Sequence, residues 1–337
     1  MIKAVLLSGV AAATLSLGVS AQEEVTSQEI IDALEKRNGT FEGYRRAHAK
    51  GMCGSGSFVG AGTDLSSAGV FGKGTSTPVT FRFSDAGGNP FINDKQEGVR
   101  AMGLIFTLPD GEEWRTAMNS IPMFIVKDPA AFKAITEAMT PDPTTGKPDP
   151  AKQGAFFGAH PESMRLIQHL QTNPPSASFM QAQYNGINAF YFVAADGSRT
   201  AVRWSMVPDA GYAPINPAEV AGKGENFLFD DLTAAVAAGP VTWTLTAQIA
   251  AEGDDLLDAT LPWPAERETV TLGTLTLSAT EPLDTGACQD ENFDPLFLPT
   301  GIEPSDDPIL YARSGAYAES FSRRYGERAD SKVATPK

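Results

Sequence analysis

The stretch Arg45-Arg46-Ala47-His48-Ala49-Lys50-Gly51 marks the point at which the sequence changes from helical to β patterning. Before it, the capping box Thr26-Ser27-Gln28-Glu29 predicts a short helix that ends at Gly39. After it, Val79-Thr80-Phe81-Arg82-Phe83 alternates apolar and polar residues, and Leu104-Ile105-Phe106 is a buried apolar run. Both patterns are typical of strands. The surroundings of the stretch therefore predict a β-rich core that follows one helix.

Apolar patterning predicts further strands beyond this region. The segments concerned are Pro122-Met123-Phe124-Ile125-Val126, Asn188–Ala195, Arg199–Met206, Val241–Ile249 and Val270–Leu277. Asp196-Gly197 is a strong hairpin turn signal between two of them. Gly273 predicts a β-bulge in the last of them.

Helices are expected between these strands and near the C-terminal end. Asp128-Pro129 is an N-cap followed by proline at the first helical position, which opens a helix through Met139. Four prolines are expected to hold Thr140–Lys152 as a loop, and Pro161 begins another helix. Ser305-Asp306-Asp307-Pro308 starts the last helix, whose C-terminal end Arg323-Arg324 would suit. Without a repeat or a linker, the pattern indicates one α+β domain.

Composition excludes several classes of function. The 337 residues include 26 Lys and Arg against 41 Asp and Glu, a formal net charge of −15. Such an acidic chain is not expected to bind nucleic acid or an anionic membrane surface, because like charges repel. With only 2 Cys and 3 His, it also cannot assemble a multi-thiolate or poly-histidine metal site.

The first residues are expected not to belong to the fold. Met1–Ala21 has Lys3 as its only charge, an apolar run over Ala4–Val19 and the small-residue site Val19-Ser20-Ala21. This pattern is typical of a cleaved export signal, and the apolar run is shorter than the roughly 20 residues of a membrane span. We therefore expect residues 22–337 to form the mature domain, in the periplasm or secreted. A permanent N-terminal anchor is the less favoured alternative.

Two elements carry candidate chemistry. In Arg313-Ser314-Gly315-Ala316-Tyr317 the first and last residues share a helix face, so the guanidinium can reach the phenol oxygen. An arginine at hydrogen-bonding distance favours phenolate over phenol. A phenolate suits Fe(III), and tyrosine is an axial ligand of haem iron in some proteins. The second element is His48, although a lone histidine beside a strand is more often structural. Neither element alone is strong evidence for a functional site.

Taken together with several other motifs, these elements resemble the haem catalase superfamily, in particular its small catalase-related peroxidase branch. The match runs from Arg45 to Arg324, with its motifs in the family's order. The motifs are Arg45–Gly51, Thr77-Pro78-Val79, Arg82-Phe83-Ser84, Val99–Phe106, Asn119 with Pro122-Met123-Phe124, His160-Pro161-Glu162, Tyr184-Asn185-Gly186, Asp258–Pro264, Phe293–Ser305, and Arg313 with Tyr317. The resemblance implies a catalase-core antiparallel β-barrel with inserted and C-terminal helices.

The resemblance implies a role for each of eight residues. Tyr317 would be the proximal ligand of the haem iron, and Arg313 would stabilise its phenolate. His48 would be the distal base that moves a proton between the two peroxide oxygens. Ser84 would fix the His48 ring, and Asn119 would hold peroxide by an amide hydrogen bond. The arginines that would bind the haem propionates are Arg45, Arg82 and Arg324.

The activity implied is that of an exported peroxidase with one haem b. It would reduce hydrogen peroxide or an organic hydroperoxide with small organic donors, and would show weak catalase activity. The chain lacks the long arms and extensions of large catalases, so a monomer or homodimer is expected. The alternatives are a compact true catalase, a periplasmic barrel that binds haem or hydroperoxide without turnover, and rearrangement of lipid hydroperoxides. The His48, Ser84 and Asn119 set favours an enzyme, since a carrier needs no positioned base.

Three features depart from the family pattern or stay open. Ser120-Ile121 makes the spacing between Asn119 and Pro122 one residue longer than usual. Ser320-Phe321-Ser322 stands where basic residues normally follow the tyrosine. Cys53 and Cys288 are the only cysteines, and whether they form a disulfide is left open.

Overall fold

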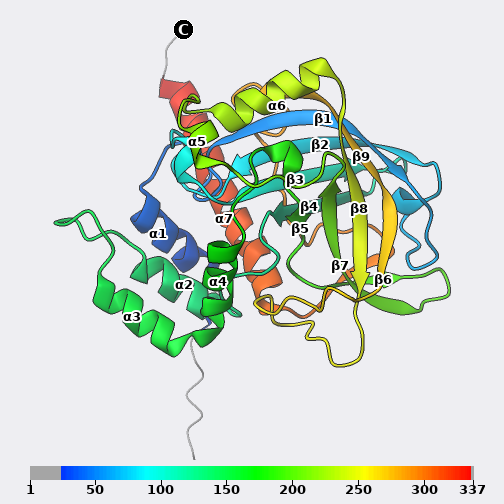
Figure 1. The fold of residues 1–337 in the computed structure, drawn as a ribbon, viewed down its shortest axis with the longest axis horizontal. Helices are drawn as coiled ribbons and strands as arrows, with labels where there is room; N and C mark the ends of the chain where they lie inside the picture. Colours follow the sequence, from blue (N-terminus) through cyan, green and yellow to red (C-terminus); the bar gives the residue numbers. More distant parts are fainter. Residues whose placement is uncertain (1–23, 335–337) are drawn as a thin grey trace, which may run out of the picture.

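The computed structural model describes residues 24–334, and its core is a closed antiparallel β-barrel (Figure 1). The described strands form one sheet in the order β10-β6-β7-β5-β4-β3-β2-β1-β9-β8, and β7 also pairs with β8. This additional pairing closes a barrel of eight strands and leaves β6 and β10 as an extension. The strands are β1 Gly51–Gly60, β2 Ser76–Asp85, β3 Arg100–Thr107, β4 Glu113–Asn119, β5 Tyr184–Asn185, β6 Phe190–Val193, β7 Arg199–Pro208, β8 Val241–Ile249, β9 Thr269–Pro282 and β10 Ile302–Pro304.

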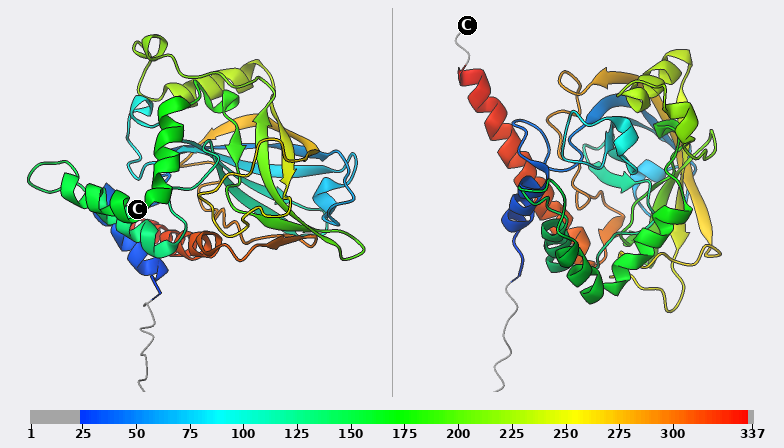
Figure 2. Two further views of the ribbon diagram at one scale, coloured as in Figure 1. Left: turned by 60° about the horizontal axis from the view of Figure 1, so that its bottom comes forward. Right: turned by 60° about the vertical axis from the view of Figure 1, so that its left-hand side comes forward.

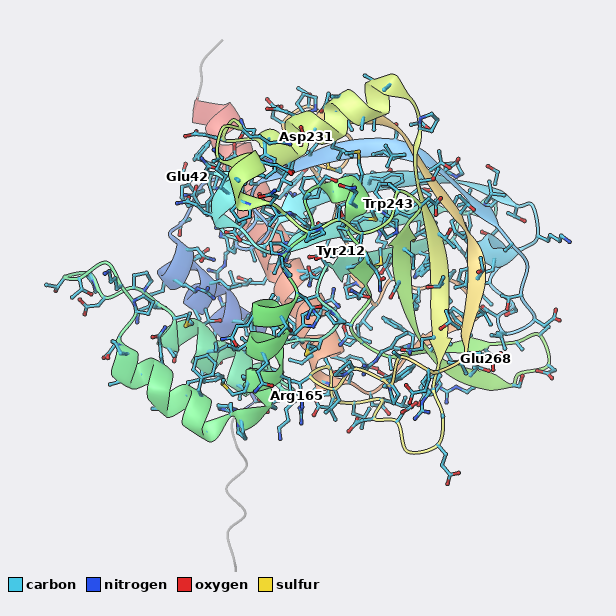
Figure 3. All side chains as sticks on the ribbon, viewed as in Figure 1. Glu42, Arg165, Tyr212, Asp231, Trp243 and Glu268 are labelled. Carbon is cyan, nitrogen blue, oxygen red and sulfur yellow. A yellow bond between two sulfur atoms is a disulfide. The ribbon has the colours of Figure 1, made fainter. Side chains whose placement is uncertain are left out.

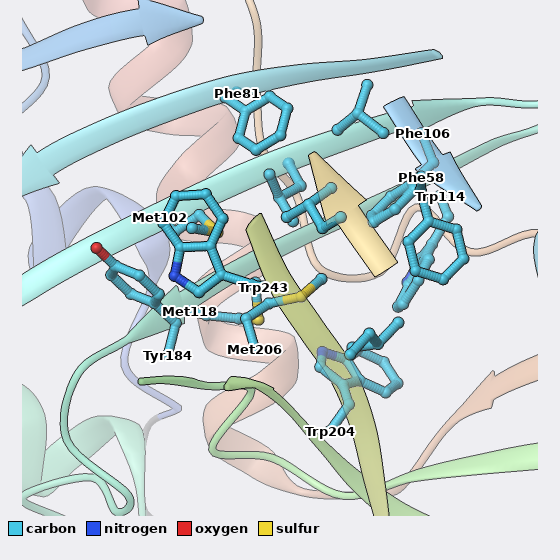
Figure 4. Close-up of a cluster of buried hydrophobic side chains, with 14 of the residues drawn as sticks. Phe58, Phe81, Met102, Phe106, Trp114, Met118, Tyr184, Trp204, Met206 and Trp243 are labelled. Atoms are coloured by element: carbon cyan, nitrogen blue, oxygen red, sulfur yellow. The ribbon is translucent and has the colours of Figure 1, made fainter. Parts of the chain in front are cut away.

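Large side chains fill the interior of the barrel. Alternate residues of each strand point inward, so the core takes Phe81 and Phe83 from β2, Phe106 from β3 and Trp114 from β4 (Figure 4). The Phe106 and Trp114 rings stack with centroids 4.6 Å apart. The interior therefore has no room for a large ligand, and the residues between these inward ones face the outside of the barrel.

Helices lie against more than one side of the barrel (Figure 2). They are α1 Ser27–Asn38, α2 Pro129–Ala138, α3 Pro150–Ala159, α4 Met164–Thr172, α5 Pro217–Val220, α6 Phe227–Ala238 and α7 Pro308–Ala334. The long helix α7 contacts α1 and α2, whereas α6 packs on β9. Figure 3 shows the side chains on this frame, with Trp243 inside the barrel and Glu42 and Glu268 on the surface.

Buried charge fastens α7 to the N-terminal segment. Arg46 is only 3% exposed and forms ion pairs with Glu35 of α1 and Glu327 of α7. Removing one partner from such a buried pair leaves an uncompensated charge, which is strongly destabilising. These pairs hold α7 beside the stretch that contains His48.

Several predicted elements are confirmed, with the caps that the sequence indicates. In α1, Thr26 Oγ1 accepts a hydrogen bond from the backbone N–H of Glu29 at 3.2 Å, which completes the capping box. Asp128 caps α2, and Asp307 Oδ1 accepts from the backbone N–H of Ile309 at 2.9 Å at the start of α7. The register of β8 and β9 shifts beside Gly273, where a bulge is predicted.

Three expectations are wrong, and one strand is not predicted at all. Pro122–Val126 forms no strand and instead packs apolar side chains against α2. The segment 140–152 is not wholly loop: α3 begins at Pro150, because the Asp149 side chain caps it as Asp128 caps α2. Strand β4 is not predicted, since the buried polar residue Thr116 interrupts its alternation. Arg323-Arg324 does not end α7, which continues to Ala334.

Among residues 24–334, no helix combines the length and apolarity that crossing a membrane requires. The predicted export signal, Met1–Ala21, lies outside the described residues.

Candidate active site

All eight residues predicted for the site line a single cavity of about 510 Å³. The cavity lies between the outer face of β2, β3 and β4 and the helices α1, α2 and α7. The segment before β1 supplies Arg45 and His48. Strands β2 and β4 supply Arg82, Ser84 and Asn119, and α7 supplies Arg313, Tyr317 and Arg324.

Strand alternation accounts for the barrel wall of the cavity. Because Phe81 and Phe83 fill the barrel, Arg82 and Ser84 point out of it, into the cavity. Gly103 lies opposite on β3, where an added Cβ would be 2.8 Å from the Phe293 ring. A side chain at this position would push Phe293, which also lines the cavity, out of its place.

His48 adopts an unusual backbone conformation with φ of 55°, in the left-handed region. Non-glycine residues in this region cost about 1–2 kcal/mol, so the surrounding structure must hold the conformation. Three hydrogen bonds do so: His48 N–H to the Ala86 carbonyl at 3.1 Å, Ala49 N–H to the Gly87 carbonyl at 2.9 Å, and Arg82 Nη2 to the His48 carbonyl at 2.6 Å. Such strain is commonly found where a side chain must be aimed at a site.

The surroundings of His48 keep its ring neutral. Burial, together with the nearby charges of Arg82 and Arg313, lowers the pKa of His48 to about 4. Ser84 Oγ lies 3.3 Å from His48 Nδ1, and the two share a hydrogen bond. The arrangement gives a proton acceptor that is unprotonated at neutral pH.

Arg313 and Tyr317 are paired on α7, as their spacing predicts. Arg313 Nη2 donates to Tyr317 Oη at 3.3 Å and to the Ala117 carbonyl at 2.7 Å. Arg313 Nη1 donates to Asn188 Oδ1 at 2.6 Å, and Asn188 Nδ2 donates to Asp307 at 2.7 Å. Asn188 is fully buried, so it has to satisfy its amide within the protein. Asn188 therefore sets the position of the Arg313 guanidinium.

Sequence reasoning missed Asn188 as a site residue, because it interprets the asparagine only as the start of a strand. No local signal marks it, because its partner Arg313 lies 125 residues away in the sequence. In the structure, the residue before it, Ile187, has a φ of 64°.

Three guanidinium groups gather at one side of the cavity. Arg45 donates to the Glu291 carbonyl at 2.8 Å, and Arg324 donates to the carbonyls of Gln289 and Glu291 at 2.7 and 2.8 Å. Burial and mutual repulsion lower the pKa of Arg82 to about 9, and burial lowers the pKa of Arg324 to about 10. The pKa of Arg45 is also well below its usual value, for the same two reasons. Clustered buried cations of this kind favour the binding of an anion.

The extra residue after Asn119 does not remove that side chain from the cavity. Ser120 pairs with Arg100 through two hydrogen bonds, from its N–H to the Arg100 carbonyl at 2.8 Å and from the Arg100 N–H to Ser120 Oγ at 3.0 Å. These bonds extend the pairing of β3 and β4 by one position. The insertion is therefore taken up after Asn119, which still lines the cavity together with Ile121.

Cys53 and Cys288 form a disulfide between β1 and the loop that follows β9. The same loop supplies the carbonyls of Cys288, Gln289 and Glu291 that hold Arg45 and Arg324. The disulfide thus fastens the loop that positions two of the three clustered arginines.

We expect the double variant Cys53→Ser/Cys288→Ser to lose about 2–5 kcal/mol of unfolding free energy, the usual effect of removing a native disulfide. Chemical denaturation followed by tryptophan fluorescence measures the change. As a control, a reducing agent should destabilise the wild type to the same extent and leave the double variant unchanged. Equal denaturation midpoints for the two proteins would contradict the prediction.

The comparisons with known proteins agree with one another. The family model described as Catalase matches residues 13–332. A catalase-related peroxidase of Synechococcus elongatus is 39% identical over 302 residues, which cover 89% of each chain. One of Mycolicibacterium paratuberculosis is 33% identical over 304 residues, 90% of this chain and 96% of that protein. A catalase of Pseudomonas aeruginosa is 30% identical, and the match covers 84% of this chain but 57% of that protein.

Solved structures share the fold. A fungal catalase superposes with a TM-score of 0.76 at 21% identity, covering 95% of this chain and 67% of that one. Catalase A from Saccharomyces cerevisiae superposes with a TM-score of 0.75 at 20% identity, covering 94% and 68%. The predicted α+β catalase-core barrel is therefore confirmed. From the family match and its relatives we conclude that the chain belongs to the haem catalase superfamily, in its branch of small catalase-related peroxidases.

Proposed function

We propose that the protein is an exported haem peroxidase that reduces hydrogen peroxide with small organic donors and has weak catalase activity. The observation that carries the proposal is one cavity with a neutral histidine on its barrel wall and an arginine-paired tyrosine on its α7 wall. A second support is the pair of relatives named catalase-related peroxidase, each matched along most of its length.

The residues of the cavity fit one haem b. The cavity volume of about 510 Å³ lies within the usual range of cofactor pockets. The cavity lining combines apolar side chains with a few polar groups. Arg45, Arg82 and Arg324 suit two carboxylates. Within the described residues, Arg82 Nε is buried without a hydrogen-bond partner, so a donor is left for a bound anion. Tyr317 Oη offers an oxygen ligand suited to Fe(III).

Each residue then has a defined task. When bound, haem would supply the redox chemistry that cleaves the O–O bond of the peroxide. His48 accepts a proton from one peroxide oxygen and delivers it to the other oxygen, which leaves as water. Ser84 holds the His48 ring by their shared hydrogen bond, and Asn119 donates an amide hydrogen bond to the peroxide. Arg313 keeps negative charge favourable at Tyr317 Oη.

Two alternatives keep the same cavity. A compact true catalase would use a second peroxide as the reductant, and the matched protein of Pseudomonas aeruginosa is named catalase. A periplasmic barrel that binds haem or hydroperoxide without turnover would not need His48. The strained backbone that aims His48 favours catalysis over storage.

Measuring oxygen release beside donor oxidation tests the proposal. On one haem-loaded preparation at equal peroxide, we expect rapid oxidation of a phenolic donor and weak release of dioxygen. One-electron oxidation needs a donor only near the haem edge, whereas the catalase step needs a second peroxide aligned with His48. Rapid dioxygen release with negligible donor oxidation would identify a compact catalase instead. No change in the absorption spectrum when peroxide is added would identify a carrier.

Export to the periplasm or the medium is part of the proposal. The pattern of Met1–Ala21 supports it, and so does the Cys53–Cys288 disulfide, because disulfides persist in oxidising compartments. We further propose a monomer or homodimer.

A further inference from the structure

The segment Ser320-Phe321-Ser322, which departs from the family pattern, places an aromatic ring in the wall of the cavity. Phe321 lines the cavity near Arg324, whose guanidinium lies 4.7 Å from the centroid of the Phe321 ring. The Phe321 ring also stacks on Tyr325, with centroids 5.8 Å apart and planes 19° apart. Tyr325 is 55% exposed. Two rings in contact thus connect the cavity to the surface.

We propose that Tyr325 is a second oxidation site, at the surface, for phenolic donors too large to enter the cavity. The inference rests on the proposed peroxidase function, which supplies the oxidant. Tyr325 gives one electron to the peroxide-oxidised cofactor through the Phe321 ring and releases its phenolic proton to water. The resulting tyrosyl radical takes one electron and one proton back from the donor.

The stoichiometry balances over one turnover. One hydrogen peroxide accepts two electrons and two protons and gives two waters. Two donor molecules each lose one electron and one proton, one after the other, and Tyr325 returns to its starting state after each. Because Tyr325 is exposed, its proton can leave to water as the electron departs and the donor can touch its ring.

The position of Tyr325 distinguishes it from the other exposed tyrosine of α7. Tyr311 is 47% exposed, but among the described residues its ring contacts no aromatic ring and it does not line the cavity. The two tyrosines therefore have similar access to solvent, and only Tyr325 is connected to the cavity. Tyr311 provides a matched control.

The test compares one methoxyphenol in two forms, free in solution and attached to dextran, with haem-loaded wild type, Tyr325→Phe and Tyr311→Phe. We expect all three proteins to oxidise the free donor at equal rates. Oxidation of the dextran-bound donor should be lost in Tyr325→Phe and unchanged in Tyr311→Phe. Oxidation of the dextran-bound donor by Tyr325→Phe at the wild-type rate would overturn the inference.

A second readout does not depend on donor turnover. With peroxide and a nitroso spin trap but no donor, mass spectrometry of the wild type should find the trap on the peptide that contains Tyr325. The adduct should disappear in Tyr325→Phe and persist in Tyr311→Phe. A wild type that carries no adduct at Tyr325 overturns the surface site alone, provided that it oxidises the free donor. Failure to oxidise the free donor would instead overturn the proposed function, and this inference with it.

Discussion

The Tyr317→Phe variant is expected to lose most of its bound haem. The change removes one oxygen atom and leaves the ring on α7, so the fold should persist. Tyr317 Oη is the proposed iron ligand, and it accepts a hydrogen bond from Arg313 at 3.3 Å. Loss of even an outer-shell partner of a metal ligand costs about 10–100-fold in affinity, so loss of the ligand itself should cost at least about 100-fold.

Haem content per chain after desalting, together with the absorption spectrum of the Fe(III) protein, measures this loss. Tyr311→Phe makes the same chemical change on the same helix, outside the cavity, and should retain haem at the wild-type level. Circular dichroism of both variants shows whether α7 has kept its helix. If Tyr317→Phe binds haem with the wild-type spectrum, Tyr317 is not the ligand.

The sequence predicts most of the barrel and the helix starts, because local physics determines them. Strands such as β8 carry clear apolar alternation, and caps such as Asp128 and Asp307 act on backbone groups two or three residues away. The wrong predictions arise where two local signals favour different structures for the same residues. At Asp149-Pro150 the run of prolines favours a loop, although Pro150 follows an aspartate that caps a helix.

The site could be predicted only in part for a different reason. The pairing of Arg313 with Tyr317 follows from helix spacing, so the sequence contains it directly. Asn188 holds the same arginine from 125 residues away, and such long-range contacts have no local signal. The same holds for the arginine cluster, since the carbonyls that hold Arg45 and Arg324 come from a loop fastened by the disulfide. The family resemblance indicates these arginines, whereas the periodicity of the sequence does not.

His48→Ala is expected to keep its haem but to cleave peroxide about 10²–10⁴-fold more slowly, the usual contribution of one positioned acid–base group. His48 is the proposed proton carrier, and no other titratable side chain is assigned to that step. Stopped-flow absorption of the haem-loaded protein during mixing with peroxide measures the rate. Reaction at the wild-type rate would exclude His48 as the base.

The pH dependence gives an independent test of the same role. Because the pKa of His48 is lowered to about 4, its ring is neutral and can accept a proton from neutral pH down to about pH 4. The wild-type rate should therefore stay level through mildly acidic pH and fall as the pH passes below about 4. In His48→Ala this acid limb should be absent.

Backbone strain could confuse the result, because His48 has a φ of 55° and alanine tolerates this region poorly. His48→Asn separates the two effects. Asparagine is among the residues most often found with positive φ, yet its amide cannot carry a proton between the peroxide oxygens. If the slow peroxide cleavage of His48→Ala reflects the missing base, both variants should be slow and both should lack the fall in rate at acidic pH. If it reflects a displaced backbone, His48→Asn should recover the rate, and the assignment of His48 as the base would fail.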